Sequence, residues 1–264
     1  MNKIGFIGMG NMGKALLKGA LKDTPKDNFI FSDKYITDEA AKALGVLKMP
    51  DNVSCVKEAK YIFLAVKPQF FGEVADEIKD YVTKDKVVIS IMAGIPVDTI
   101  NKSLGGNVRV IRVMPNTPAL VEAGMSGVCF DASEYQESEK ETVLGILKAC
   151  GRVKIVTEAM MSAVTCASGS SPAYVYMFIE ALADSVVKYG IPRDMAYEMA
   201  AQTVLGAAKM VLETGENPAV LKDRVCSPAG TTIAAVAALE EYGFRNAIFK
   251  ATDKCYARAE ELKK

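Results

Sequence analysis

The chain has 264 residues, half of them apolar, and its charges balance, with 32 Lys and Arg against 32 Asp and Glu. This balance, without a dense basic run, argues against nucleic acid as a partner. The sequence contains no histidine, which excludes Ser-His-Asp triads, Cys-His pairs and H-E-x-x-H zinc sites.

The first part of the chain alternates short apolar runs with helical patterns. Nearly continuous apolar runs predict strands buried on both faces at residues 3–8, 28–33, 61–66, 87–91, 108–113, 125–130 and 152–156. Helical patterns cover residues 14–22, 38–44, 70–81 and 137–150. This alternation predicts an α/β domain over residues 1–158, a Rossmann-type doubly wound and mostly parallel sheet.

The character of the sequence changes after about Glu158, where β-runs stop and long helical segments begin. In residues 173–189, Glu180, Asp184 and Lys188 form one narrow charged stripe on a largely apolar helix, and residues 195–212 repeat the arrangement. Charges in the middle of each helix argue against a membrane span. Helices apolar over most of their circumference must be buried, so residues 159–264 are expected to form an all-helical domain that dimerises or assembles further.

The six cysteines are scattered and form no C-x-x-C pair. This usage is typical of reduced core residues, and together with the missing histidines it predicts no metal site. The N-terminus carries no long apolar stretch of the signal-peptide kind. We therefore expect a cytoplasmic protein.

A glycine-rich loop follows the first predicted strand and opens the first helix: Gly8, Met9, Gly10, Asn11, Met12 and Gly13. The first glycine makes the tight turn, the second admits a pyrophosphate, and the third lets the helix pack on the strand. The phosphates would then meet the N–H groups at the helix N-terminus. With a second strand that ends in an acid about twenty residues on, the loop predicts a nicotinamide dinucleotide site.

The acid at the end of the second strand bears on the choice of cofactor. Asp33 suits the ribose hydroxyls of NAD, whereas its neighbours Ser32 and Lys34 suit the 2′-phosphate of NADP. This segment leaves both cofactors open. Residues 65–68, 92–94 and 114–118 follow further strands, where the carboxyl ends of an open α/β sheet line the ligand crevice.

Two segments of the helical half resemble helix starts. Residues 168–173 and residues 227–232 both combine proline with hydroxyl side chains, as helix N-termini do. Unpaired N–H groups at a helix start, together with neighbouring hydroxyls, suit a substrate carboxylate. The simpler interpretation is that these two segments only cap their helices.

Over essentially its whole length the chain resembles the pyrroline-5-carboxylate reductase family. The resemblance rests on the sequences at residues 5–12 (GFIGMGNM), 65–68 (AVKP), 114–118 (MPNTP) and above all 221–232 (LKDRVCSPAGTT). Two positions depart from the family, which commonly has glycine where this chain has Ser171 and Ala229. The first departure predicts a slightly different turn, and the second is expected to be harmless.

The resemblance implies reduction of 1-pyrroline-5-carboxylate to L-proline, the last step of proline biosynthesis, by NADPH in preference to NADH. It also implies cofactor contacts from Asn52, Ala65, Val66, Lys67, Pro68, Ile91, Met92 and Ala93. Substrate contacts would come from Glu158, Ser227, Gly230, Thr231 and Thr232. Thr232 would orient the ring nitrogen and is the one residue assigned to catalysis.

Two other classes of protein compete with this interpretation. The β-hydroxyacid dehydrogenases share the glycine-rich start but need a lysine early in the helix after the linker, and residues 173–187 contain none. A non-catalytic NADP sensor would have no reason to keep a carboxylate receptor. The sequence therefore favours a reductase.

Overall fold

The computed structural model describes residues 3–263, so the extreme ends of the two predicted domains, residues 1–2 and 264, lie outside it. The chain forms two compact units: one contains residues up to 170 together with those from 255 onward, and the other contains residues 171–254. A single boundary after Glu158 remains a prediction, since the compact units divide the chain differently.

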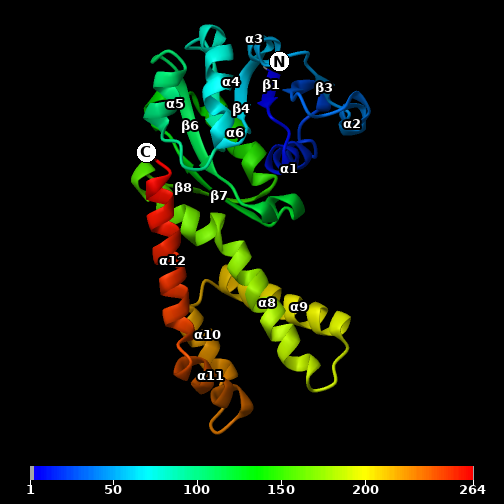
Figure 1. The fold of residues 1–264 in the computed structure, drawn as a ribbon, viewed down its shortest axis with the longest axis vertical. Coiled ribbons are helices and arrows are strands. Elements are labelled where there is room, and N and C mark those ends of the chain that lie inside the picture. Colours follow the sequence, from blue (N-terminus) through cyan, green and yellow to red (C-terminus); the bar gives the residue numbers. More distant parts are fainter. Residues whose placement is uncertain (1–2, 264) are drawn as a thin grey trace. The chain divides into compact units, whose positions relative to one another are not determined.

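The first unit contains an eight-stranded sheet with the order β3-β2-β1-β4-β5-β6-β7-β8. The strands are β1 (Lys3–Ile7), β2 (Phe29–Ser32), β3 (Leu47–Lys48), β4 (Ala59–Leu64), β5 (Val87–Ser90), β6 (Arg109–Met114), β7 (Gly124–Cys129) and β8 (Gly151–Ile155). All neighbours pair in parallel except β6 and β7. This confirms the predicted doubly wound, mostly parallel sheet (Figure 1).

Helices cover both faces of this sheet because its strands alternate two apolar sets. One set, with Phe6 stacked on Phe63 at a ring-centroid distance of 4.7 Å, packs against α1 (Asn11–Ala20) and α6 (Glu137–Lys148). The other set packs against α3 (Asn52–Glu58), α4 (Phe71–Ile78) and α5 (Val97–Ser103). The remaining helices of this part are α2 (Asp38–Leu44) and α7 (Met161–Val164). The core therefore lies in two layers, one on each side of the sheet.

The register places the carboxyl ends of the central strands side by side. Ile7 of β1 pairs with Ser32 of β2 and with Leu64 of β4. The residues that follow these three strands consequently meet at one edge of the sheet, which we call the carboxyl edge.

The second unit is helical. Its elements are α8 (Ser171–Val187), α9 (Arg193–Thr214), α10 (Pro218–Val225), α11 (Thr231–Glu241) and the first part of α12 (Phe244–Glu261). Its only buried cluster in the described residues consists of Ala183, Ala196 and Ala200, where α8 and α9 pack. Within residues 3–263, none of the helices has the length and apolarity needed to span a membrane.

Candidate active site

The glycine-rich loop has the three glycine environments that the sequence predicts. Gly8 has φ +91°, and a Cβ there would come within 2.8 Å of the Ala65 carbonyl oxygen. A Cβ on Gly13 would come within 2.8 Å of the Gly8 carbonyl oxygen. Gly10 has ordinary backbone angles, and nothing lies within 4 Å of the position of its Cβ. The turn thus requires glycine at position 8, and the helix packing requires glycine at position 13. Gly10 instead leaves open space at the N-terminus of α1.

The loop is tied to the end of β2. The Ser32 carbonyl accepts the Gly8 N–H at 2.9 Å, and Asp33 Oδ2 accepts the Met9 N–H at 2.7 Å. Asp33 Oδ1 accepts the N–H groups of Tyr35 and Ile36 at 2.7 and 3.1 Å. Asp33 therefore shapes the loop, in addition to any contact it makes with a ribose.

The neighbours of Asp33 differ in exposure. Ser32 is buried at 5% exposure, whereas the Lys34 side chain is exposed, with Nζ 5.6 Å from the centroid of the Tyr35 ring. An exposed lysine beside the end of β2 is free to swing toward an anion at the carboxyl edge.

The other predicted cofactor residues follow the ends of neighbouring strands. The Ala65 N–H donates to the Ile7 carbonyl at 2.8 Å, and the Ile91 N–H donates to the Leu64 carbonyl at 3.2 Å. Lys67, Pro68 and Ala93 are exposed, while Met92 is buried. Asn52, the first residue of α3, donates from Nδ2 to Glu77 Oε2 at 2.7 Å. The first unit thus gathers these residues at its carboxyl edge.

Glu158 also belongs to the first unit, unlike the other four predicted substrate residues. Its Oε1 accepts the Val97 N–H at 2.7 Å and a bond from Arg112 Nη1 at 3.1 Å. One carboxylate oxygen thus has two partners, and the side chain stays 40% exposed.

The substrate segment of the second unit starts α11. Gly230 is the N-cap, without a side-chain capping bond, and its N–H donates to the Ser227 carbonyl at 3.0 Å. A Cβ on Gly230 would meet Ser227 Oγ at 2.3 Å, so the hydroxyl lies directly against this glycine. Thr231 and Thr232 supply the first helical N–H groups, which have no partner within a helix. Ser227, Gly230, Thr231 and Thr232 thus lie together at the start of α11.

Residues 168–173 span the end of a π-helical turn and the start of α8, and their role as a cap of that helix stays a prediction. Residues Thr165–Gly169 form a π-helical turn, in which the Ser168 hydroxyl donates back to the Val164 carbonyl at 3.1 Å. That hydroxyl is thereby used within the turn. Ser171 begins α8 and, unlike Ala229 with φ +55°, is not among the described non-glycine residues with positive φ. Ala229 is therefore the strained departure, contrary to the expectation that it is harmless.

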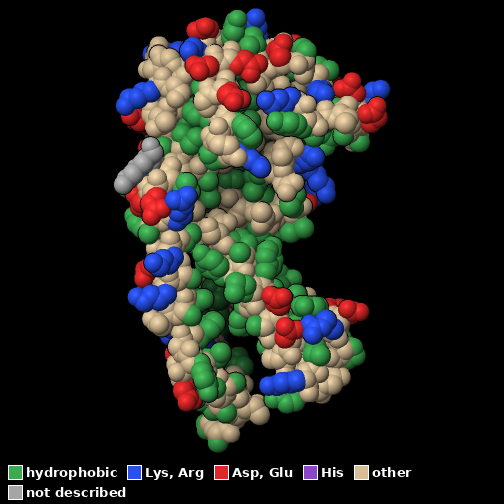
Figure 2. All heavy atoms as spheres, viewed as in Figure 1, with side chains coloured by type: hydrophobic (Ala, Val, Ile, Leu, Met, Phe, Trp, Pro, Cys, Tyr) green, Lys and Arg blue, Asp and Glu red, His purple; other side chains and the backbone are tan. Residues whose placement is uncertain are grey.

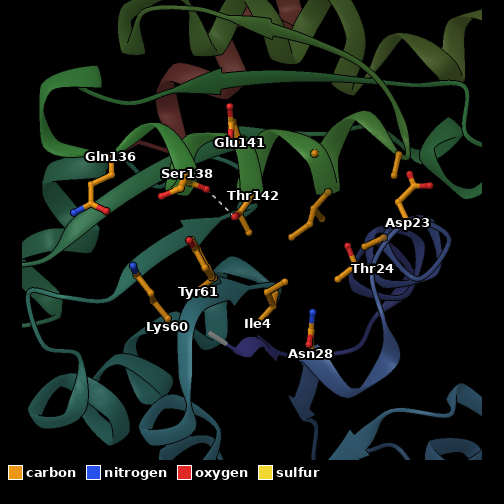
Figure 3. A pocket seen from close by; sticks show the side chains of 14 residues that line it. Ile4, Asp23, Thr24, Asn28, Lys60, Tyr61, Gln136, Ser138, Glu141 and Thr142 are labelled. Carbon is orange, nitrogen blue, oxygen red and sulfur yellow. Dashed lines mark hydrogen bonds between the residues drawn. The ribbon is translucent and has the colours of Figure 1, made fainter. Parts of the chain in front are cut away.

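A separate hollow of about 510 Å³ lies at the opposite, amino edge of the sheet. Figure 3 shows Ile4 and Tyr61 from the amino ends of β1 and β4 facing Ser138 and Thr142 of α6. This hollow contains none of the predicted site residues.

Two buried polar residues lie near the carboxyl edge, and only Asn116 falls in a segment that the sequence predicts to line the ligand crevice, residues 114–118. Arg112 lies in β6 with a side chain 7% exposed, and Asn116 donates to the Ser168 carbonyl at 3.0 Å. A charged residue between apolar neighbours in a buried strand is the signal that could have identified Arg112.

Known protein families match both halves of the chain. Residues 3–94 match the family model described as NADP oxidoreductase coenzyme F420-dependent, and residues 158–262 match pyrroline-5-carboxylate reductase dimerisation. The pyrroline-5-carboxylate reductases of Escherichia coli and Methanosarcina acetivorans are each 46% identical, over 99% of this chain and 98% of theirs.

Solved structures of two reductases also match the chain over nearly its whole length. The pyrroline-5-carboxylate reductase of Coxiella burnetii matches with a TM-score of 0.91 and 33% identity, over 100% of this chain and 99% of that one. The pyrroline carboxylate reductase of Plasmodium falciparum, solved with NADP bound, matches with a TM-score of 0.89 and 30% identity, over 100% and 98%.

The fold, the glycine-rich loop and the helical region define an oxidoreductase with an NAD(P)-binding domain. More narrowly, the chain belongs to the pyrroline-5-carboxylate reductase family, and it reduces pyrroline-5-carboxylate to proline.

Proposed function

We propose that this reduction uses NADPH in preference to NADH, with the dinucleotide bound along the carboxyl edge. The observation that carries the proposed cofactor site is the open space at Gly10, between two glycines that are tightly packed. N–H groups at the start of α1 face this space, so the residues present fit a pyrophosphate. When bound, the dinucleotide supplies a hydride to C5 of the cyclic imine.

The residues of the chain have the task of positioning the two reactants. A protonated imine is already electrophilic, so its reduction needs orientation more than a strong acid. We propose that the start of α11 holds the substrate, with N–H groups and the Thr231 hydroxyl on its carboxylate. The Thr232 hydroxyl then orients the ring nitrogen, and Ser227 and Gly230 shape this receptor.

The preference for NADPH rests on the neighbours of Asp33. The exposed Lys34 can neutralise a 2′-phosphate, and the Asp33 carboxylate already serves three N–H groups. The Plasmodium relative, solved with NADP, supports the same choice. Because the charge of Asp33 opposes a phosphate, we propose that NADH is also used.

A second copy of the chain is the proposed partner. Large apolar side chains of the second unit are exposed, among them Met177 at 68%, Leu205 at 57% and Phe249 at 69%. Figure 2 shows apolar side chains along the helices of this unit. Only alanines are buried between α8 and α9, so these helices need further cover, which a homodimer would supply. The dimerisation family matches this same region.

We further propose that the enzyme works in the cytoplasm, where its six cysteines, none of them in a disulfide in the described structure, stay reduced.

Gly10→Val tests the cofactor site. The substitution fits the backbone and the open space, so folding should be unaffected, but the side chain would occupy the place of the pyrophosphate. We expect NADPH binding, measured by titration of its fluorescence, to fall at least about a hundredfold. Gly72→Ala, at another open glycine in α4, is the control and should bind normally. Unchanged binding in Gly10→Val would place the cofactor elsewhere.

A further inference from the structure

Arg112 is a buried cation near the carboxyl end of β6. Its side chain is 7% exposed, and Nη1 donates to Glu158 Oε1 at 3.1 Å. A buried guanidinium without a carboxylate partner would be strongly destabilising. Glu158 is therefore held in one place by a strand of the sheet.

The same Glu158 oxygen accepts the Val97 N–H at 2.7 Å. Val97 is the first residue of α5, and the N-cap of that helix, Pro96, supplies no side-chain acceptor. Glu158 thus takes over, from 61 residues away, the capping that the local sequence does not provide.

The segment that leads into Val97 connects β5 to α5 at the carboxyl edge. It carries Ile91, Met92 and Ala93, and it is fixed at two further points. The Ser90 hydroxyl accepts the Met92 N–H at 3.3 Å, and Ser90 is fully buried. Gly94, with φ +82°, packs so closely on Leu262 that a Cβ would approach the Leu262 carbonyl oxygen to 3.2 Å.

We infer that Arg112 and Glu158 are positioning residues that brace residues 91–96 against the sheet and thereby place the dinucleotide for hydride transfer. This inference rests on the proposed cofactor site. Neither side chain needs to touch the reacting atoms. Displacement of the segment would misplace the cofactor, and misplacement on the scale of 1 Å is costly for a transfer that depends on alignment.

Two single variants and their combination test the brace. Glu158→Gln keeps the size of the side chain and an acceptor oxygen but removes the charge that faces Arg112. Arg112→Met removes the guanidinium and keeps most of the stem. Each should raise the KM and the Kd for NADPH about three- to tenfold and lower kcat, with the KM for pyrroline-5-carboxylate unchanged. The double variant should lose little more than either single variant, because both remove one contact.

The chain offers a matched control on the same strand. Arg109, at the amino end of β6, pairs with the buried Glu139 at 2.7 Å. Glu139→Gln should lower the melting temperature while leaving both KM values unchanged, since this pair lies away from the carboxyl edge. If Arg112→Met does not fold, Arg112→Lys keeps the buried charge but loses the guanidinium geometry, and its kinetics should shift in the same direction.

Two results would overturn the inference. One is that Glu158→Gln behaves like Glu139→Gln, with lost stability and normal kinetics. The other is that Glu158→Gln raises only the KM for pyrroline-5-carboxylate while Arg112→Met does not, which would make Glu158 a substrate ligand. The proposed cofactor site fails separately, because its own test is the binding of NADPH by Gly10→Val.

Discussion

Asp33 Oδ2 accepts the backbone N–H of Met9 at 2.7 Å, so the end of β2 holds the loop that follows β1. Because of this contact, a substitution of Asp33 affects the structure of the loop as well as the choice of cofactor. Removing the carboxylate releases the glycine-rich loop as well as any bond to a ribose. A test of cofactor choice must therefore keep an acceptor at this position.

Asp33→Asn meets that requirement, because an amide oxygen can replace one carboxylate oxygen while the charge is lost. Two charges about 4 Å apart near a surface interact by roughly 1–4 kcal/mol, so the ratio of kcat/KM for NADPH to that for NADH should rise at least about fivefold. Lys34→Ala should lower the same ratio, and Asp33→Ala should impair both cofactors. Steady-state kinetics with each cofactor gives the answer. An unchanged ratio in Lys34→Ala would show that this lysine is merely solvated.

The exposed apolar residues of α9 predict which substitutions dissociate the proposed dimer. Leu205 and Leu212, seven residues apart on one helix face, are 57% and 56% exposed in the single chain. Replacing both by Glu should convert the wild-type dimer or larger species into a monomer in sedimentation experiments. Leu47 and Leu120 of the first unit, 58% and 47% exposed, provide the control pair. A monomeric wild type, or an equal effect of the control pair, would refute the proposed interface.

The spacing of apolar residues and the positions of glycine and proline in the sequence were sufficient to predict most of the sheet and the loop after β1. Apolar runs such as residues 61–66 indicate a buried strand directly, and the spacing of Gly8, Gly10 and Gly13 indicates their separate tasks. The two-residue strand β3 was not predicted, because it carries too few residues to show a period. The seven-residue helices α3 and α5 were not predicted either, although α2, of the same length, was predicted at residues 38–44.

Contacts between distant parts of the chain were also beyond the sequence pattern. The bond from Arg112 to Glu158 spans 46 residues and that from Val97 spans 61. Nothing in local spacing relates these three residues; only the fold brings them together. The π-helical turn at Thr165–Gly169 was not predicted either, since the hydroxyl residues and proline at residues 168–173 indicate only a helix start.

Ala229 should limit the stability of the segment before α11. Its φ of +55° lies in the left-handed region, which costs a residue with a Cβ about 1–2 kcal/mol. Ala229→Gly relieves this strain but gives the unfolded chain more freedom, so a net gain of about 0.5–1 kcal/mol in unfolding free energy is expected. Denaturant unfolding followed by circular dichroism measures it. Ala234→Gly, inside α11, should instead destabilise, and a loss in both variants would contradict the strain at Ala229.

The ion pair of Glu139 predicts acid sensitivity. Hydrogen bonds from Arg109 and then from Lys60 and the Gln136 N–H outweigh burial and lower the pKa of Glu139 to about 2, from an ordinary value of 4.5. A lowered folded-state pKa stabilises the protein above the unfolded value, and this contribution is lost as the pH falls from about 4.5 toward 2. With solvent screening, the loss should be about 1–2 kcal/mol. Glu139→Gln should flatten this part of the curve of unfolding free energy against pH, and an equally steep curve would assign the acid sensitivity to other carboxyls.

Thr232 is the residue on which the proposed chemistry depends most directly. Its position in the first turn of α11, two residues after the uncapped Gly230, places a donor and acceptor at a helix start. Loss of one well-placed hydrogen bond costs on the order of 1–3 kcal/mol, so Thr232→Ala should lower kcat about ten- to a hundredfold. The Kd for NADPH should stay unchanged, because the cofactor residues belong to the other unit. Thr232→Ser keeps the hydroxyl and should retain most of the activity. Thr142→Ala, which removes a hydroxyl bonded to the Ser138 carbonyl in α6, should be kinetically normal. If Thr232→Ala turns over at the wild-type rate, the substrate nitrogen must be oriented by another group.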